Sequence, residues 1–167
     1  MAIEREEIDR RLEQFKSVAK LADIKLTHQR LVIFRAVVSS ENHPSAEAVY
    51  KAVRAEIPTV SLDTVYRTLW LLMDLGLLTT LGPRRDSVRF DANLKQHHHF
   101  LCMRCGLVRD FESSEFNELP IQDSVNRFGD IVCAQVEVQG VCDSCAKKAD
   151  DAETASDSRT EDRDRSK

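Results

Sequence analysis

The stretch SLDTVYRTLWLLMDLGLLTTLGPRRDSVRFD, residues 61–91, decides the fold. Its first half places apolar residues at helical spacing after Ser61, a residue type that favours the start of a helix, and Gly76 is the type that ends one. After Gly76, two short apolar runs flank a Gly-Pro-Arg-Arg-Asp turn, which predicts a β-hairpin. The rest of the chain is interpreted outward from this helix and hairpin.

Upstream, the sequence predicts three more helices. Residues 4–22 repeat apolar side chains at alternating steps of four and three, and Thr27 precedes the apolar block Leu31–Val38. Pro44 cannot continue a preceding helix, and Ser45 is a good first residue for a third helix that runs to about Glu56. Four helices followed by a hairpin predict the winged-helix variant of the helix-turn-helix, in which the helix before the hairpin reads DNA.

Downstream, residues 92–96 are expected to be a hinge. Residues 97–103 and 107–112 predict two strands, a helix should begin at Ser113 or Ser114 and run to about Phe128, and Ile131–Gly140 alternates like a third strand. The expected class is α+β, with a winged-helix DNA-binding domain at 1–91 and a small α/β domain at 97–148. Residues 149–167 contain no hydrophobe larger than alanine and are expected to be disordered.

The charge of the chain is unevenly distributed. The 167 residues carry a net charge of −4, yet residues 1–92 hold 14 Lys and Arg against 13 Asp and Glu, and the acidic excess lies in residues 93–167. Charge therefore permits DNA binding by the first half without requiring it. No apolar run approaches the roughly 18 residues of a membrane span, and the N-terminus has no signal-peptide core. A cytoplasmic protein with no membrane partner is expected.

Four of the five cysteines form two Cys-x-x-Cys pairs, Cys102 with Cys105 and Cys142 with Cys145. In a chain without a secretion signal such pairs indicate metal ligands before disulfides. Two pairs close a tetrahedral four-thiolate shell around zinc, and a closed shell indicates a structural role. Unliganded thiols and a disulfide redox switch remain the alternatives. Cys133 is interpreted as an ordinary strand residue, although a reactive thiol there stays open.

A second group of candidate metal ligands contains histidines and aspartates. His97 and His99 would share one face of a strand, Asp91 lies just upstream, and Asp110 belongs to the neighbouring strand. His43, between two N-terminal helices, could reach in from the first domain. Imidazole with carboxylate suits divalent iron, manganese, cobalt or zinc, and ligands from both domains would couple domain orientation to metal. The alternative is a solvated polar strand.

Taken together, these motifs resemble the ferric uptake regulator family over about residues 10–146. The matching segments are Thr27–Arg30, His43-Pro44, Thr64–Leu69, Arg89–Asp91, the His97-x-His99-x-x-Cys102-x-x-Cys105-Gly106 run and Gly140–Cys145. The resemblance implies a homodimeric repressor whose C-terminal α/β domain dimerises and whose DNA operator is an A/T-rich inverted repeat. It implies one structural Zn²⁺ per subunit on the four paired cysteines. It also implies one regulatory Fe²⁺ or Mn²⁺ per subunit on His43, Asp91, His97, His99 and Asp110, with no small organic cofactor.

Within that family the aspartate at position 110 is similar to the peroxide-responsive branch, whereas iron-uptake regulators typically carry glutamate. The resemblance then implies that bound iron reacts with hydrogen peroxide, that His43 or His97 is oxidised, and that repression ends as the metal is lost. The alternative is an iron-, zinc- or manganese-responsive uptake repressor that does not sense peroxide. Arg67 follows Tyr66 as in iron-uptake regulators, which leaves the DNA-site preference open.

The predicted DNA-reading side chains lie on the helix before the hairpin. Thr64, Arg67 and Thr68 fall on its polar stripe, where an arginine can bond a guanine edge. Tyr66 can contact a thymine methyl or a phosphate. Phosphate or minor-groove contacts are expected from Arg84, Arg85 and Arg89 of the wing, and a phosphate contact from Arg30. A solvated helix face is the alternative. No enzyme is expected, because hydrolysis would need an open metal position with a separate base, and reactive thiols usually start a helix.

Overall fold

The computed structural model describes residues 4–84 and 87–148, and the chain divides into two compact units, residues 1–95 and 96–167. The predicted tail at 149–167 and the predicted DNA contact Arg85 lie outside the described residues. The side chain of Arg84 is likewise outside them. The division between the units falls inside residues 92–96, and bending there stays a prediction.

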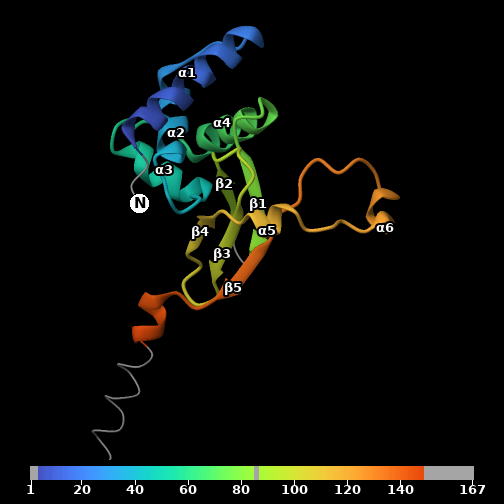
Figure 1. The fold of residues 1–167 in the computed structure, drawn as a ribbon. Coiled ribbons are helices and arrows are strands. Elements are labelled where there is room, and N and C mark those ends of the chain that lie inside the picture. Colours follow the sequence, from blue (N-terminus) through green and yellow to red (C-terminus); the bar gives the residue numbers. More distant parts are fainter. Residues whose placement is uncertain (1–3, 85–86, 149–167) are drawn as a thin grey trace, which may run out of the picture. The chain divides into compact units, whose positions relative to one another are not determined.

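Unit 1 begins with four helices, α1 (Arg5–Leu21), α2 (His28–Val38), α3 (Ala46–Arg54) and α4 (Leu62–Asp74) (Figure 1). The three predicted helix starts are confirmed, because the hydroxyls of Thr27, Ser45 and Ser61 accept backbone N–H groups of their own first turns. Each cap satisfies a donor that the helix cannot, which fixes where the helix begins. No helix in the described part of the chain is long and apolar enough to cross a membrane.

The apolar faces of these helices form the core of unit 1. Phe15 of α1 and Phe34 of α2 lie edge to face with their ring centroids 5.2 Å apart, and both side chains are buried. Such aromatic pairs are favourable beyond the area that they bury. The remaining core side chains come from all four helices and from the segment after them, and they include Ile33, Val37, Val49, Val65, Leu69, Leu72, Leu77 and Phe90.

The predicted hairpin follows α4 directly. Strands β1 (Thr79–Arg84) and β2 (Ser87–Asp91) pair antiparallel, with Thr79 opposite Asp91 and an irregularity between Leu81 and Arg84. Gly76, at φ 67°, reverses the chain after α4 in a conformation that favours glycine. Helices α2 to α4 with this wing make unit 1 a winged helix.

Unit 2 is built on a three-stranded sheet with the order β4-β3-β5. Strand β3 (His98–Cys102) pairs antiparallel with β4 (Val108–Phe111) and parallel with β5 (Glu137–Gly140). Two short helices, α5 (Ser114–Asn117) and α6 (Asp123–Asn126), lie in the connection between β4 and β5. At Gly140, an added Cβ would come within 2.9 Å of the Phe100 ring, so glycine lets β5 approach β3.

Two predicted elements of unit 2 are wrong in extent. The expected helix to Phe128 is broken into α5 and α6, and Pro120 between them cannot extend a helix from the preceding turn. The expected strand from Ile131 is regular only from Glu137. The side chains of Phe128 and Val132 are 89% and 96% exposed, so the described residues do not bury these two side chains.

Candidate metal centres and DNA-reading surface

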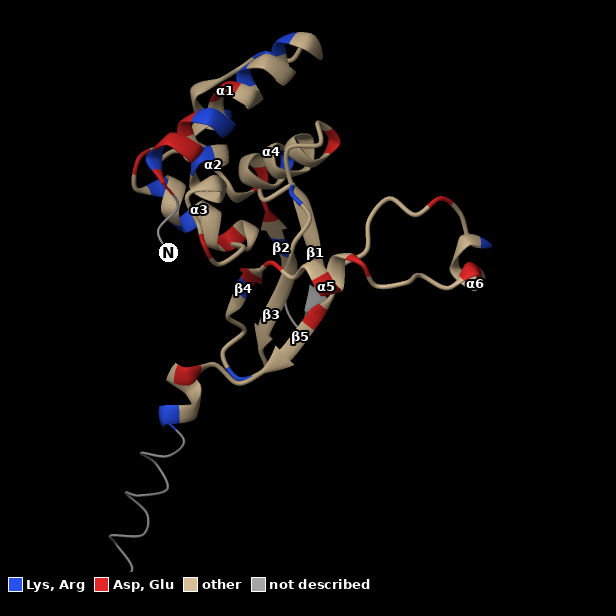
Figure 2. Cartoon of the chain, viewed as in Figure 1, with Lys and Arg blue, Asp and Glu red and all other residues tan. Residues whose placement is uncertain are grey.

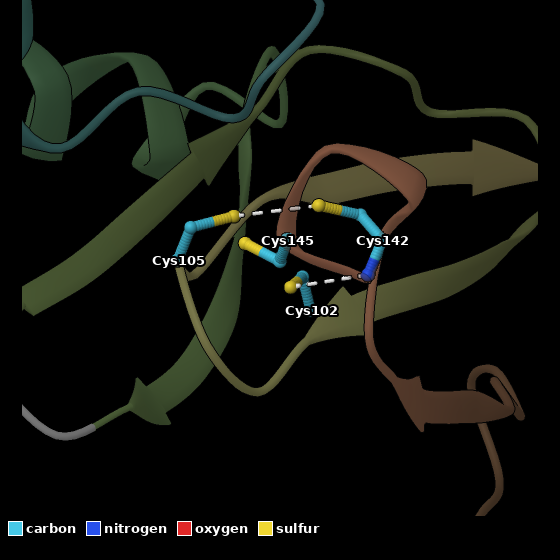
Figure 3. Close-up of side chains that lie close together, drawn as sticks. All are labelled: Cys102, Cys105, Cys142 and Cys145. Carbon is cyan, nitrogen blue, oxygen red and sulfur yellow. Dashed lines mark hydrogen bonds between the residues drawn. The ribbon is translucent and has the colours of Figure 1, made fainter. Parts of the chain in front are cut away.

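The four paired cysteines converge at one end of the unit 2 sheet (Figure 3). Cys102 ends β3, and Cys105 follows in a turn closed by a hydrogen bond from the Gly106 N–H to the Cys102 carbonyl. Gly106 has φ 71°, which suits glycine. The second pair starts the helical segment 143–148 just after β5, and its Cys142 lies beside the first pair.

The spacing of these sulfur atoms fits a zinc ion. All four Sγ atoms lie within 4.8 Å of one another, and those of Cys105 and Cys142 are 3.7 Å apart. A tetrahedron with zinc–sulfur bonds of about 2.3 Å places its sulfurs about 3.8 Å apart, whereas a disulfide needs about 2 Å. The structure holds all of these cysteines as free thiols. The geometry therefore favours a metal shell over paired disulfides.

The electrostatics of the cluster also suit a cation. Backbone N–H groups of Cys105 and Cys142 bond to the Cys102 sulfur and lower the pKa of that thiol to about 6. The sulfurs of Cys105 and Cys142 hydrogen-bond to Cys145 and raise the pKa of its thiol to about 12. Close thiols resist ionising together, so a divalent cation is the group that would stabilise four thiolates here.

Unit 2 also brings three of the predicted regulatory ligands together. The Nε2 atoms of His97 and His99 lie 2.8 Å apart. Asp110 sits opposite His99 in the β3–β4 register. Its Oδ1 lies 3.7 Å from the Nε2 of His99, and its Oδ2 lies 3.7 Å from the Nε2 of His97. Two imidazole nitrogens and a carboxylate thus converge, as alternation along β3 predicts for residues 97 and 99.

Unit 1 holds the other two predicted ligands as a pair. The Nε2 of His43 lies 3.4 Å from a carboxylate oxygen of Asp91, the last residue of β2. The turn at His43 is fixed to β2, because Arg89 donates to the carbonyls of Asn42 and His43 and the Phe90 N–H donates to that of Pro44. His43 has φ 47°, an uncommon backbone conformation for a residue other than glycine.

His98 points away from this set, as alternation on a strand requires. Its ring is fully buried, packs against Phe111 and Phe116, and accepts the Val136 N–H on Nδ1 at 3.1 Å. The resemblance to the ferric uptake regulator family also predicts that a further metal site of that family is absent or altered here, because His98 and Ala134 stand where its ligands would be. The aromatic surroundings of His98 are consistent with a core role.

Three of the predicted DNA contacts, Arg30, Thr64 and Arg67, line one groove of about 520 Å³ between the start of α2 and α4. The charged residues that line the groove, Lys25, Arg30 and Arg67, are all basic. Figure 2 shows Lys and Arg interspersed with Asp and Glu on the helices of unit 1 as a whole. Arg67 is 80% exposed and pairs with Asp63 at 3.0 Å. The lining residues are Lys25, Thr27, Gln29, Arg30, Thr64, Arg67, Thr68 and Leu71.

Tyr66 takes a different position from its neighbour Arg67. It is half-buried against the core of unit 1, and its hydroxyl donates to Glu47 of α3 at 2.6 Å. Sequence reasoning missed Lys25 in the groove, and it missed Glu47 and Asp63 as partners of Tyr66 and Arg67. The pair Asp63–Arg67 was discoverable, since residues four apart meet on a helix, whereas Glu47–Tyr66 depends on helix packing.

Comparisons with known proteins agree with the fold and show the family. Residues 21–138 match the model of the ferric uptake regulator family. A peroxide-responsive repressor, PerR of Staphylococcus aureus (strain Mu50 / ATCC 700699), is 34% identical over 149 residues, covering 89% of this chain and all of the relative. The family match therefore extends over residues of both units.

Two solved structures share the fold. The ferric uptake regulator of Pseudomonas aeruginosa with manganese is 29% identical, covers 77% of this chain and 97% of its own, and has a TM-score of 0.60. The Helicobacter pylori ferric uptake regulator, described as having three functional metal-binding sites, has a TM-score of 0.69 at 21% identity, with 87% and 97% coverage. The chain belongs to the ferric uptake regulator family of metal-responsive transcription regulators.

Proposed function

We propose that the protein is a metal-dependent transcriptional repressor that senses hydrogen peroxide. The observation that carries the proposal is the carboxylate of Asp110, 3.7 Å from the Nε2 atoms of both His97 and His99. Aspartate at this position resembles the peroxide-responsive branch of the family. The S. aureus relative, a peroxide-responsive repressor, supports the same choice.

The regulatory metal in this proposal is Fe²⁺ or Mn²⁺, one per subunit. Unit 2 offers His97, His99 and Asp110, and unit 1 offers the pair His43 and Asp91. Neither set alone fills the shell of about six ligands that these ions usually take, whereas three imidazoles and two carboxylates nearly do. We propose that one ion takes ligands from both units and so fixes their orientation for DNA binding.

Peroxide would end repression by changing a ligand. His43, Asp91, His97, His99 and Asp110 would hold iron(II), which would supply the electron that starts cleavage of the O–O bond. In the net reaction, one peroxide oxygen enters an imidazole carbon of His43 or His97 as an oxo group, and the other leaves as water, so the imidazole loses two electrons. The oxidised ring is a poorer nitrogen donor, and the site loses its metal affinity.

The zinc site and the exposed apolar segment assign the remaining roles in this proposal. Cys102, Cys105, Cys142 and Cys145 would hold one structural Zn²⁺ and clamp the end of β5 to the first Cys-x-x-Cys turn. The apolar side chains that unit 2 exposes between α5 and β5, Phe128 and Val132 among them, are those that a second copy of the chain would cover. The protein would therefore act as a homodimer in the cytoplasm.

DNA would be bound by unit 1 of each subunit, on an A/T-rich inverted repeat that matches the symmetry of the dimer. Thr64, Tyr66 and Arg67 of α4 would read bases, and Arg30 would bind phosphate at the start of α2. Arg84 and Arg85 remain expected phosphate contacts of the wing.

Iron loading followed by dilute peroxide tests the proposal. DNA binding should require the metal and should fall after peroxide treatment, and mass spectrometry should find one added oxygen on the peptides containing His43 or His97. The manganese-loaded protein is the matched control and should keep binding, since Mn²⁺ does not reduce peroxide in this way. An iron-loaded protein that keeps both its DNA and its unmodified histidines would contradict peroxide sensing.

The same experiment separates the second candidate, an iron-, zinc- or manganese-responsive uptake repressor. Arg67 directly after Tyr66, as in iron-uptake regulators, is the observation that favours it. Such a repressor would bind DNA when loaded with the metal that it senses. It would release the DNA only when that metal is withdrawn, whether or not peroxide is present.

A further inference from the structure

We infer that Glu47 of α3 is a positioning residue for DNA reading, because it holds the Tyr66 ring of α4 against α3 and occupies the hydrogen of its hydroxyl. The inference rests on the proposed function, since it presumes that Tyr66 contacts DNA. Glu47 lies outside the reading helix α4, and its hydrogen bond limits which groups of DNA Tyr66 is able to recognise.

The contact is short and joins two helices. The Tyr66 hydroxyl donates to Glu47 Oε1 at 2.6 Å across 19 residues of sequence, and both side chains are half-buried. A phenol that donates to a carboxylate forms a charge-assisted hydrogen bond, which is shorter and roughly twice as strong as a neutral one. The bond therefore fixes the ring before DNA arrives.

Glu47 is itself held in place. It lies in the first turn of α3, next but one to the N-cap Ser45, where the helix dipole favours a negative charge. Hydrogen bonds from Tyr66, from its own backbone N–H and from the Ser45 hydroxyl lower the pKa of Glu47. The carboxylate is ionised at neutral pH and can only accept.

This arrangement decides between the two contacts that a tyrosine could make. A phosphate oxygen accepts hydrogen bonds and cannot donate them, and Tyr66 has a single hydroxyl hydrogen. Because Glu47 takes that hydrogen, Tyr66 is left with its ring and its lone pairs for DNA. The ring suits the methyl group of thymine, an apolar contact in the major groove.

The neighbouring residue shows the contrast. Arg67 pairs with Asp63 one turn away on the same helix, and the two side chains are 80% and 67% exposed. Water competes for such a pair, and exposed pairs of this kind hold their partners weakly. Arg67 is therefore free to exchange Asp63 for a base edge, whereas the ring of Tyr66 is already oriented when it enters the major groove of DNA.

The test is a mutant cycle measured on the operator bound best by the metal-loaded wild-type protein, with random-sequence DNA in parallel. Glu47→Ala and Tyr66→Phe should each weaken operator binding about tenfold, the loss expected for one charge-assisted hydrogen bond. The double variant should bind no more weakly than Tyr66→Phe, because both changes remove the same bond. Glu47→Gln should bind nearly as the wild type, since its amide oxygen still accepts from Tyr66.

A second readout removes the thymine methyls. Replacing operator thymines by uracil should weaken the wild-type protein and should weaken Glu47→Ala much less. Asp74→Asn, at the other end of α4, changes the charge equally and should leave both results as in the wild type. Circular dichroism and zinc content show that each variant is folded.

Additive losses in the double variant, or equal uracil effects in wild type and Glu47→Ala, would overturn the positioning role. A different result would reject the DNA role on which it rests. If Tyr66→Ala binds the operator as tightly as the wild type, Tyr66 does not contact DNA at all.

Discussion

Asp110 on β4 lies opposite His99 on β3 in an antiparallel register, and its two carboxylate oxygens each approach a different imidazole, one of His99 and one of His97, at 3.7 Å. The short aspartate side chain reaches this position from a strand whose backbone is fixed by the sheet. The register of two strands thus determines which three donor groups of unit 2 meet.

Changing Asp110 to Glu should keep metal-dependent DNA binding and slow the response to peroxide by at least about tenfold, the scale on which a displaced ligand partner affects metal-site chemistry. Glutamate retains the negative charge but carries the carboxylate one methylene further. The measurement is the rate at which the iron-loaded protein loses DNA in peroxide. A response as fast as that of the wild type would remove the reason for placing the protein in the peroxide-sensing branch.

Cys142→Ser should release the structural zinc and cost most of the stability of unit 2, because one lost thiolate opens a closed shell whose binding energy is also folding energy. Zinc content and dimer mass by analytical ultracentrifugation would measure both effects. Cys133→Ser is the matched control, since Cys133 is exposed and outside the cluster, and it should retain zinc. A folded, zinc-free dimer of the Cys142 variant would show that the site is not structural.

Zinc binding should release about one proton more per ion below pH 6 than above it, because the Cys102 thiol, with a pKa of about 6, is already ionised at neutral pH. Zinc affinity therefore falls as the pH falls, and it falls by about one power of ten per pH unit more steeply below about pH 6 than above it. Titration calorimetry of the metal-free, reduced protein in buffers of different ionisation enthalpy counts the protons. Cys102→Ser should not hold zinc, so its control is the ultraviolet absorbance of thiolate in the metal-free protein, which should lose the step near pH 6. A wild-type proton count that does not change with pH would contradict the assignment.

Phe15→Ala should lower the free energy of unfolding of unit 1 by about 3–5 kcal/mol, since it deletes a fully buried ring and its contact with Phe34. Leu21→Ala, on the same helix but 88% exposed, should change it little. Denaturant unfolding followed by circular dichroism compares the two. Equal losses would mean that α1 is not anchored by its aromatic contact.

Unit 1 was predictable from sequence because its signals are local. Thr27, Ser45 and Ser61 cap the helices that follow them, and the change of apolar period after Gly76 marks the wing. The convergence of the two Cys-x-x-Cys pairs was predictable as well, because zinc chemistry restricts what such spacing can mean.

The segment from Ser113 to Gly140 was harder to predict, because several of its apolar side chains are not buried by the described residues of this chain. Alternation from Ile131 predicts a strand with an apolar face, but a lone subunit leaves that face exposed, and only Glu137–Gly140 pairs with β3. The contact between Glu47 and Tyr66 was not predicted, for a related reason. Its role depends on how α3 packs on α4, which no spacing in the sequence reveals.

The hydrogen bonds from β2 to the turn at His43 have a consequence for how a metal would be captured. Arg89 and Phe90 fasten that turn beside Asp91, so the first unit presents a preassembled chelating pair, and an ion need not gather five separate side chains. If one ion takes ligands from both units, as proposed, metal affinity would depend on the effective concentration of one chelator around the other, which the length and stiffness of residues 92–96 would set. Evolution could retune the sensor's threshold by changing this connecting segment alone, with every ligand left in place.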